Sequence, residues 1–276
     1  DLKSKIILIS GPTASGKSSF AIQLAKKIKG EIINADSMQV YKQLKVLSAR
    51  PDPKNYQSIK HHLYGFQDAK KSFSTGDWLK IANKKIIEVR KRKKIPVLVG
   101  GTGLYFKALT DGLVQIPNIP VRFRNQIRNL HKQIGQNNFH KQLLKLDPLS
   151  KNKINPTDTQ RSIRSFEVKK FTKKSLHDWF KNTKSNYLEE DFFKIYIDYP
   201  REELVKRINQ RTGKMIKMGA VNEVQKFLKL KIKKQMTACK AIEIKEIQEY
   251  LDNEKKIVEI KEKISIKTRQ YAKRQS

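Results

Sequence analysis

The chain has 276 residues, which is enough for one large domain or for a core with a smaller inserted domain. It carries 60 lysines and arginines against 26 aspartates and glutamates, a formal net charge of +34 at pH 7. So many positive side chains repel one another in a compact fold, and they favour a polyanionic partner, above all nucleic acid. A base bias in the genome, which favours lysine, isoleucine and asparagine, is the alternative explanation of the charge.

The one cysteine, Cys239, excludes an internal disulfide and a zinc cluster built on cysteines. It is consistent with a reducing compartment, and we expect a cytoplasmic protein. No apolar run approaches the roughly 18 residues of a membrane span, so we expect no membrane association. The short apolar run at 5–10 leads directly into a glycine-rich loop and is interpreted as a strand rather than a leader segment.

Strands alternate with helices along much of the chain, which predicts an α/β fold with a parallel sheet. Strands are expected at 5–10, 31–36, 95–101 and 192–199, and helices at 18–29, 78–94 and 201–219. In the first of these helices, Phe20, Leu24 and Ile28 fall on one apolar face.

The region between Pro117 and about Glu190 has a different pattern. It is nearly all helical by pattern, rich in lysine, asparagine and glutamine, and interrupted by LDP and INPTD. We therefore predict a core formed by residues 1–118 and 192–276, with a helical insertion domain at 119–191. The tail from about Val221 is predicted to be helical and basic.

A phosphate-binding loop follows the first strand, where the chain reads GPTASGKS, a complete G-x-x-x-x-G-K-S motif. Its two glycines let backbone N–H groups converge on phosphate oxygens at the positive end of the next helix. The lysine adds a charge, and the last hydroxyl is a candidate Mg²⁺ ligand. The predicted diphosphate-binding residues are Gly11, Pro12, Thr13, Ala14, Ser15, Gly16, Lys17 and Ser18, with Ser18 as the metal ligand.

This loop recognises a diphosphate and does not by itself specify ATP or another nucleotide. The sequence has no N-K-x-D stretch for guanine and no apolar strand that ends in an obvious D-x-x-G. The loop can therefore serve phosphoryl transfer, with attack at phosphorus. It can equally hold diphosphate as a leaving group while the attack takes place at carbon.

Three further stretches carry a family resemblance: NADSMQVY at 34–41, VLVGGTGLYFKAL at 97–109 and NPTDTQRSIRSFEV at 155–168. Together with GPTASGKS, HHLYGF and the terminal RQYAKRQ, they resemble the bacterial tRNA dimethylallyltransferase family over essentially the whole chain. The resemblance implies a P-loop core with a helical insert. It also implies transfer of a dimethylallyl group from dimethylallyl diphosphate to N6 of the adenine immediately 3′ of the anticodon, with release of diphosphate. Mg²⁺ as cofactor, binding of the tRNA anticodon stem-loop and a monomeric state are expected with it.

The resemblance implies catalytic roles for Asp36, Thr102, Arg211 and Lys17. Asp36 would act as general base, because an exocyclic amine conjugated to a ring is a poor nucleophile until its proton is taken. Arg211, helped by Arg207, would neutralise the charge that develops on the departing diphosphate. The alternatives are a helix cap or a Mg²⁺-organising residue for Asp36, a helix cap for Thr102, and solvated surface positions for the arginines.

The resemblance also implies tRNA contacts at the mouth of the site, in the insert and near the chain end. These are Asp36, Ser37, Met38, Gln39, Thr102, Arg124, Gln160, Arg161, Ser162, Ile163, Arg164, Lys240 and Lys245. The chain departs from the family at Glu243, where the family usually has glycine. A carboxylate there is expected to repel phosphates.

Three other functions are considered. A P-loop kinase of a nucleoside or small molecule would share the loop, but it has no need of a charge of +34. A prenyltransferase of free adenine nucleotides would have no use for the insert and its QRSIR segment. An RNA-binding protein with a vestigial loop would not be expected to keep Lys17, Ser18, Asp36, Thr102 and Arg211 together.

Overall fold

The computed structural model describes residues 2–234 and 236–275. The chain divides into two compact units, one formed by Asp1–Thr110 with Tyr187–Ser276 and the other by Asp111–Asn186. The sequence led us to expect the insertion at 119–191.

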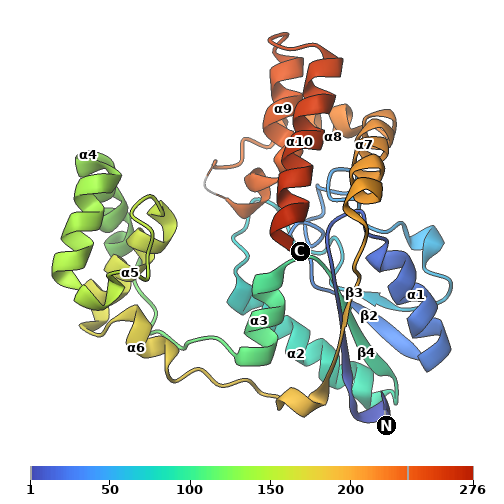
Figure 1. The fold of residues 1–276 in the computed structure, drawn as a ribbon, viewed down its shortest axis with the longest axis horizontal. Helices are drawn as coiled ribbons and strands as arrows, with labels where there is room; N and C mark the ends of the chain where they lie inside the picture. The colour runs from blue at the N-terminus through green and yellow to red at the C-terminus, as the bar shows by residue number, and fades with distance from the viewer. Residues whose placement is uncertain (1, 235, 276) are drawn as a thin grey trace. The chain divides into compact units, whose positions relative to one another are not determined.

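The first unit is built on a five-stranded sheet with all strands parallel, in the order β3-β2-β4-β1-β5 (Figure 1). The strands are β1 (Ile6–Ser10), β2 (Gly30–Asn34), β3 (His61–His62), β4 (Ile95–Val99) and β5 (Phe192–Tyr196). The predicted α/β class with a parallel sheet is confirmed. Four of the strands were expected, and β3 was not, because two residues carry no recognisable pattern.

Helices surround this sheet and form the whole of the second unit's regular structure apart from a 3₁₀ turn. Those of the first unit are α1 (Lys17–Ile28), α2 (Thr75–Lys91), α3 (Gly103–Asp111), α7 (Arg201–Lys217), α8 (Ala220–Lys229), α9 (Ile242–Leu251) and α10 (Ile257–Gln275). Those of the second are α4 (Val121–Leu146), α5 (Thr159–Thr172) and α6 (Leu176–Phe180). Among the described residues, no helix is both long enough and apolar enough to cross a membrane.

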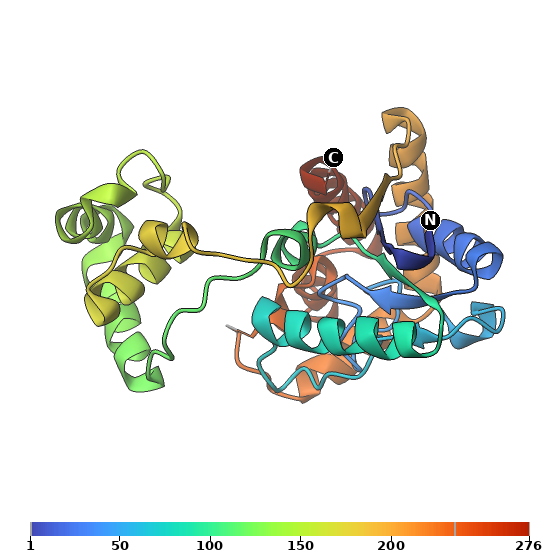
Figure 2. The same cartoon turned by 90° about the horizontal axis from the view of Figure 1, so that it is seen from below.

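The two faces of the sheet are covered by different helices (Figure 2). Alternate residues of a strand point to opposite faces, so Ile7 and Ile9 pack with α1 while Ile6 and Leu8 pack with α2. Trp78 of α2 is fully buried, and its indole N–H donates to the carbonyl of Asn34 at 2.9 Å. This bond ties α2 to the end of β2, where the site begins.

The apolar face expected for α1 is partly wrong. Phe20 is 39% exposed, and the residues of α1 that are buried are Ala21, Ile22 and Ala25. Two alanines on this face keep the helix close to the sheet, and a Cβ built on Gly30 of β2 would lie 3.4 Å from the Cα of Ala25. Leu24 and Ile28 pack at the margin of the same core.

The HHLYGF motif, which contributed to the resemblance, serves packing at the edge of the sheet. His61 stacks on Tyr56 with 3.6 Å between ring centroids. His62 lies 2.7 Å from the buried carboxylate of Glu31, which also accepts two hydrogen bonds from Arg92. These contacts hold β3 against β2.

The second unit has a hydrophobic core of its own. Phe139 and Leu143 of α4 are fully buried and pack with Phe166 of α5. Gly135 interrupts α4 with a φ of 75°, in the left-handed region that glycine adopts without strain. The break lets the two halves of α4 close over α5.

Candidate active site

The site lies where three parallel strands end, which is the usual ligand position in open α/β sheets. The phosphate loop follows β1, Asp36 follows β2, and the segment Gly100–Thr102 follows β4. A Cβ on Gly100 would lie 2.1 Å from the carbonyl oxygen of Ala35. The ends of β2 and β4 therefore approach as closely as they do only because position 100 is glycine.

The phosphate loop has the backbone shape that its sequence predicts. Gly11 has a φ of 147° and faces the Ile197 carbonyl, and Gly16, the N-cap of α1, has a φ of 91°. No side chain caps the first turn of α1, so its N–H groups can receive an anion. The hydroxyl of Ser15 is buried and has no hydrogen-bond partner within the described structure. A phosphate held in the loop would satisfy these donors.

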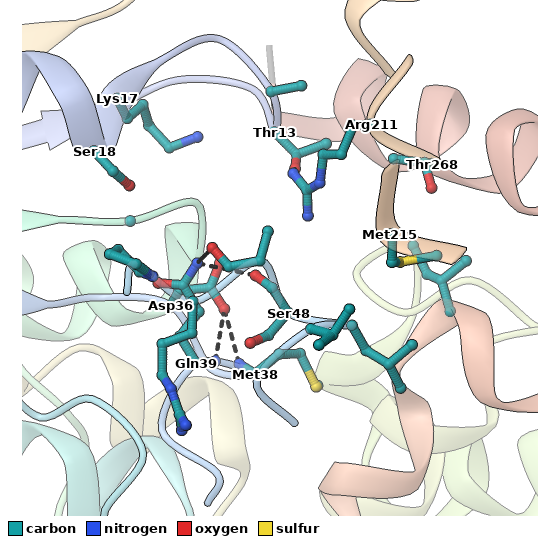
Figure 3. A pocket seen from close by; sticks show the side chains of 18 of the residues that line it. Thr13, Lys17, Ser18, Asp36, Met38, Gln39, Ser48, Arg211, Met215 and Thr268 are labelled. Atoms are coloured by element: carbon teal, nitrogen blue, oxygen red, sulfur yellow. Dashed lines mark hydrogen bonds between the residues drawn. The ribbon is translucent and has the colours of Figure 1, made fainter. Parts of the chain in front are cut away.

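Lys17 is held inside the loop, where its ammonium donates to the carbonyl of Pro12 at 2.6 Å. Burial lowers the pKa of Lys17 to about 8; nearby Asp36 raises the pKa and Arg211 lowers it. An anion bound beside it would favour the charged form. Figure 3 shows Lys17, Ser18 and Arg211 around the same space as Asp36.

One oxygen of the Asp36 carboxylate is engaged in local hydrogen bonds. Its Oδ1 accepts from the backbone N–H groups of Met38 at 2.8 Å and Gln39 at 3.2 Å. The Asn34 side chain holds the Asp36 backbone on both sides, accepting from its N–H and donating to its carbonyl. Asp36 thus caps the following turn, which is one of the alternative roles given for it above. These hydrogen bonds engage Oδ1, so Oδ2 is left to take a proton from a substrate.

Thr102 acts on the site through its neighbour rather than by lining the cavity. Its Oγ1 accepts from the backbone N–H of Ser37 at 2.9 Å and lies 3.3 Å from the Ser37 hydroxyl. The cavity wall includes Ser37 but not Thr102. The structure therefore places Thr102 as a support for the segment that follows Asp36.

Two arginines of α7 reach the phosphate loop. The Nη1 of Arg211 donates to the hydroxyl of Thr13 at 2.7 Å. The Arg207 guanidinium lies over the ring of Tyr199 at 4.8 Å, and its nitrogens are the atoms nearest to a Cβ built on Gly16. Both arginines line the cavity; Arg211 is half-buried there, whereas Arg207 is exposed.

A cavity of about 900 Å³ joins these groups. One part of its wall is polar and cationic, and another is apolar, with Met38, Val46, Leu47, Met215 and Met218. The predicted site residues that line it are Thr13, Ala14, Gly16, Lys17, Ser18, Asp36, Ser37, Met38, Gln39, Arg211 and Lys240. Gly11, Pro12 and Ser15 are buried in the loop itself, and Lys245 is exposed on α9, outside this lining.

Glu223, which no sequence pattern predicted, fixes one wall of the cavity. The carboxylate of Glu223, on α8, accepts from three successive backbone N–H groups, those of Lys45, Val46 and Leu47, at 2.8–3.1 Å. These bonds fix the loop that supplies part of the apolar wall. No local sequence pattern predicts these hydrogen bonds, because the partners are more than 170 residues apart.

A second missed residue is Gln275, the last residue of α10. It contacts both the phosphate loop and the segment after β4. The terminal RQYAKRQ stretch was the available signal, but no role was assigned to it.

Glu243, the departure from the family pattern, is buried near the start of α9 and lines the cavity. Its pKa is raised to about 7, chiefly by burial; Arg211 acts to lower the pKa, and Glu246 and Glu223 act to raise it. Near neutral pH a large fraction of this side chain is therefore uncharged. The repulsion of phosphates expected from the sequence is reduced by this protonation.

Glu243→Gln is expected to remove a loss of stability that the wild-type protein shows as pH rises. The folded pKa, about 7, lies above the ordinary 4.5, so the folded state binds the extra proton and is favoured at low pH. The free energy of unfolding should fall by up to about 3 kcal/mol between pH 4.5 and 8 on this account. Urea unfolding at pH 5 and pH 8 measures it.

The glutamine variant should show a smaller loss of unfolding free energy between these two pH values. Glu262→Gln, on the exposed side of α10, is the control that should keep the wild-type pH dependence. Equal losses in the wild type and the Glu243 variant would contradict the assignment.

In the second unit, the predicted QRSIR segment opens α5 and divides between surface and interior. Arg161 is 75% exposed, and its guanidinium pairs with Asp158 at 2.9 Å, while Gln160 is also exposed. Ser162 is fully buried, and Ile163 packs against the core of this unit. The structure thus gives Ser162 and Ile163 packing contacts and leaves the paired guanidinium of Arg161 exposed at the surface.

Three arginines gather around one buried carboxylate of α5. Glu167 lies within 3.4–3.8 Å of Arg124, Arg128 and Arg164, each of which is partly exposed. One negative charge among three positive ones leaves an excess of positive charge at this surface. Arg124 and Arg164 were predicted to contact tRNA, and Arg128, which joins them in space, was not.

The comparisons with known proteins agree with this geometry. A sequence model of the family described as IPP transferase matches residues 39–276. A tRNA dimethylallyltransferase of Pelagibacter ubique is 59% identical over 276 residues, covering 100% of this chain and 88% of that protein.

Solved structures show the same similarity. The full-length tRNA isopentenylpyrophosphate transferase of Bacillus halodurans superposes with a TM-score of 0.68 at 30% identity, covering 99% of this chain and 85% of that one. A eukaryotic dimethylallyltransferase acting on tRNA superposes with a TM-score of 0.85 at 28% identity, covering 98% and 68%.

Proposed function

The chain belongs to the IPP transferase family, and we propose that it transfers a dimethylallyl group from dimethylallyl diphosphate to tRNA. The acceptor atom is N6 of the adenine immediately 3′ of the anticodon, and diphosphate is released. The observation that carries the proposal is the composition of one cavity, in which a phosphate loop, a carboxylate and an apolar wall face the same space.

Each part of the cavity suits one part of the reaction. The loop and the cations of Lys17 and Arg211 suit the diphosphate, and Val46, Leu47 and Met215 suit a five-carbon chain. Asp36 lines the same cavity and is the group that can accept a proton. A kinase would share the loop, and the similarity to tRNA dimethylallyltransferases favours prenyl transfer over phosphoryl transfer.

The reaction proceeds by attack at carbon. The lone pair of the N6 amine forms the new C–N bond to the allylic carbon while the C–O bond to diphosphate breaks. Asp36 takes the proton that the amine loses, and Arg211 and Lys17 receive the negative charge on the leaving oxygen. The protein thereby orients the two substrates and stabilises the departing group.

Magnesium would fit beside the loop. Mg²⁺ prefers oxygen ligands and is commonly held by one or two protein groups together with substrate phosphates. The Ser18 hydroxyl lines the cavity and supplies such an oxygen. No cluster of three or more histidine, cysteine or acidic side chains suited to a metal occurs among the described residues, so the phosphates would complete the set. The ion would neutralise diphosphate charge.

The direct test is incubation with dimethylallyl diphosphate, Mg²⁺ and total tRNA, followed by mass analysis of the nucleosides. Prenylated adenosine is the expected product, and omission of dimethylallyl diphosphate is the control. Label transferred from γ-labelled ATP would instead indicate a kinase. Prenylation of free adenine nucleotides in preference to tRNA would indicate the other alternative. We expect a monomer that acts in the cytoplasm, where tRNA is found.

Arg161→Ala is expected to weaken tRNA binding because it removes an exposed guanidinium from the start of α5. If Arg161 neutralises one phosphate, the slope of log K against log salt should fall in magnitude by about one unit. Filter binding at salt concentrations from about 50 to about 300 mM measures this slope. Lys91→Ala, at the end of α2, is the charge-matched control, and an unchanged slope in the Arg161 variant would remove this residue from the interface.

A further inference from the structure

The side chain of Gln275 joins two loops of the site that are far apart in sequence. Its Oε1 accepts from the backbone N–H of Thr13 at 2.8 Å, and its Nε2 donates to the carbonyl of Gly101 at 2.8 Å. The phosphate loop and the segment after β4 are thereby bridged by one amide, supplied by α10.

The bridge continues to the residues that carry the chemistry. Thr13, whose N–H binds Gln275, accepts a hydrogen bond from Arg211 at its hydroxyl. Gly101, on the other side, directly precedes Thr102, which holds the N–H of Ser37. A chain of hydrogen bonds thus runs from Arg211 through Thr13 and Gln275 to the segment that supports the turn after Asp36.

The space at Gly101 is matched to the same side chain. A Cβ built on Gly101 would lie 2.2 Å from the Nε2 of Gln275, and its three nearest neighbours are all atoms of Gln275. The backbone of Gly101 has no positive φ that would demand glycine. Glycine at this position therefore leaves room for the Gln275 amide.

On the premise of the transfer reaction above, we propose that Gln275 is a positioning residue. It sets the distance between the leaving-group side of the cavity, with Thr13 and Arg211, and the acceptor side, supported by Thr102. It lines the cavity, and both polar atoms of its amide are engaged in the bridge. The backbone N–H of Thr13 donates to Gln275 and is therefore not available to a phosphate. The bridge shapes the loop rather than supplying a ligand.

The test compares variants of Gln275 in the full chain. Gln275→Met keeps the length and shape but removes both hydrogen bonds, and it is expected to lower the single-turnover rate about 10- to 100-fold, the scale of a small misplacement of reacting groups. Gln275→Glu keeps the acceptor for Thr13 and loses the donor, so its rate should lie between. The tRNA dissociation constant should stay within about twofold of wild type, and the Kd of inorganic diphosphate should rise.

A double-mutant cycle isolates the bridge from general loss of packing. Gly101→Ala should displace the Gln275 amide and reproduce the rate defect. In the Gln275→Ala background it should add little, because the atoms it would strike are gone. Gln270→Ala, an exposed glutamine of the same helix, is the matched control and should keep the wild-type rate.

The outcomes separate the bridge from the reaction it serves. A wild-type rate and an unchanged diphosphate Kd in Gln275→Met would overturn the positioning role, as would additive effects of the two substitutions. If Gln275→Met did not fold, Gly101→Ala and the cycle would still decide. Absence of prenylated adenosine with the wild-type protein would refute the proposed function, whereas diphosphate calorimetry would still report on the bridge.

Discussion

Asp36→Asn is expected to lower the single-turnover rate of dimethylallyl transfer by about 10²- to 10⁴-fold, the usual contribution of a positioned general base. The asparagine keeps an oxygen that can accept from Met38 and Gln39, so the turn after β2 is retained. It cannot take the proton from N6. Quenched-flow assays with saturating tRNA and dimethylallyl diphosphate measure the step, and filter binding should give a near-normal tRNA affinity.

The matched control for this substitution is Asp68→Asn. Asp68 also accepts a backbone N–H two residues ahead, from Lys70, and it lies outside the cavity lining. It should leave the transfer rate unchanged. A rate near that of the wild type for Asp36→Asn would show that another group, or water, takes the proton.

Arg211→Ala is expected to lower the same rate by about 10²- to 10³-fold, as for loss of one preorganised donor to developing negative charge. The substitution also removes a positive charge beside the phosphate loop, so the Kd of inorganic diphosphate should rise. Arg211→Lys keeps the charge without the forked geometry and should recover only part of the rate. Single-turnover kinetics and diphosphate calorimetry measure the two effects.

Arg201→Ala, in the first turn of the same helix, provides the control because Arg201 is exposed and lies outside the cavity lining. If Arg211→Ala bound diphosphate and reacted as the wild type does, the leaving-group role would pass to Arg207 or Lys17. The double substitution of Arg207 and Arg211 would then distinguish these two.

The parts of the site that the sequence predicts are local. A strand, a loop of fixed length and a helix are adjacent in the chain, so the geometry around Lys17 and Ser18 follows from spacing alone. Asp36 was expected at the end of a strand and lies two residues after β2. Because parallel strands share one carboxyl edge, the fold class was enough to bring it beside the loop.

Periodicity did not determine which face of a helix is buried. Phe20, Leu24 and Ile28 make an apolar row on α1, yet the sheet is met by Ala21 and Ala25. Small residues permit closer approach than large ones, and this preference depends on the shape of the sheet rather than on the helix itself. The two-residue strand β3 was not predicted for a similar reason, because only its pairing with β2 makes it a strand.

Contacts between distant residues could not be predicted at all. Glu223 binds a loop more than 170 residues earlier, and Gln275 binds Thr13 across 262 residues. Glu243 was expected to repel phosphates because its sequence neighbours say nothing about burial. Only the packing of α9 over the cavity shows that its pKa is raised to about 7.

The gathering of Lys17, Arg207 and Arg211 around the loop has a consequence for the protein before any substrate arrives. Like charges held close together oppose folding, and the lowered pKa of Lys17 reflects its burial together with that repulsion. A bound diphosphate relieves the strain and adds its binding energy to the folded state. The folded protein should therefore resist proteolysis for longer when diphosphate occupies the loop than when the loop is empty.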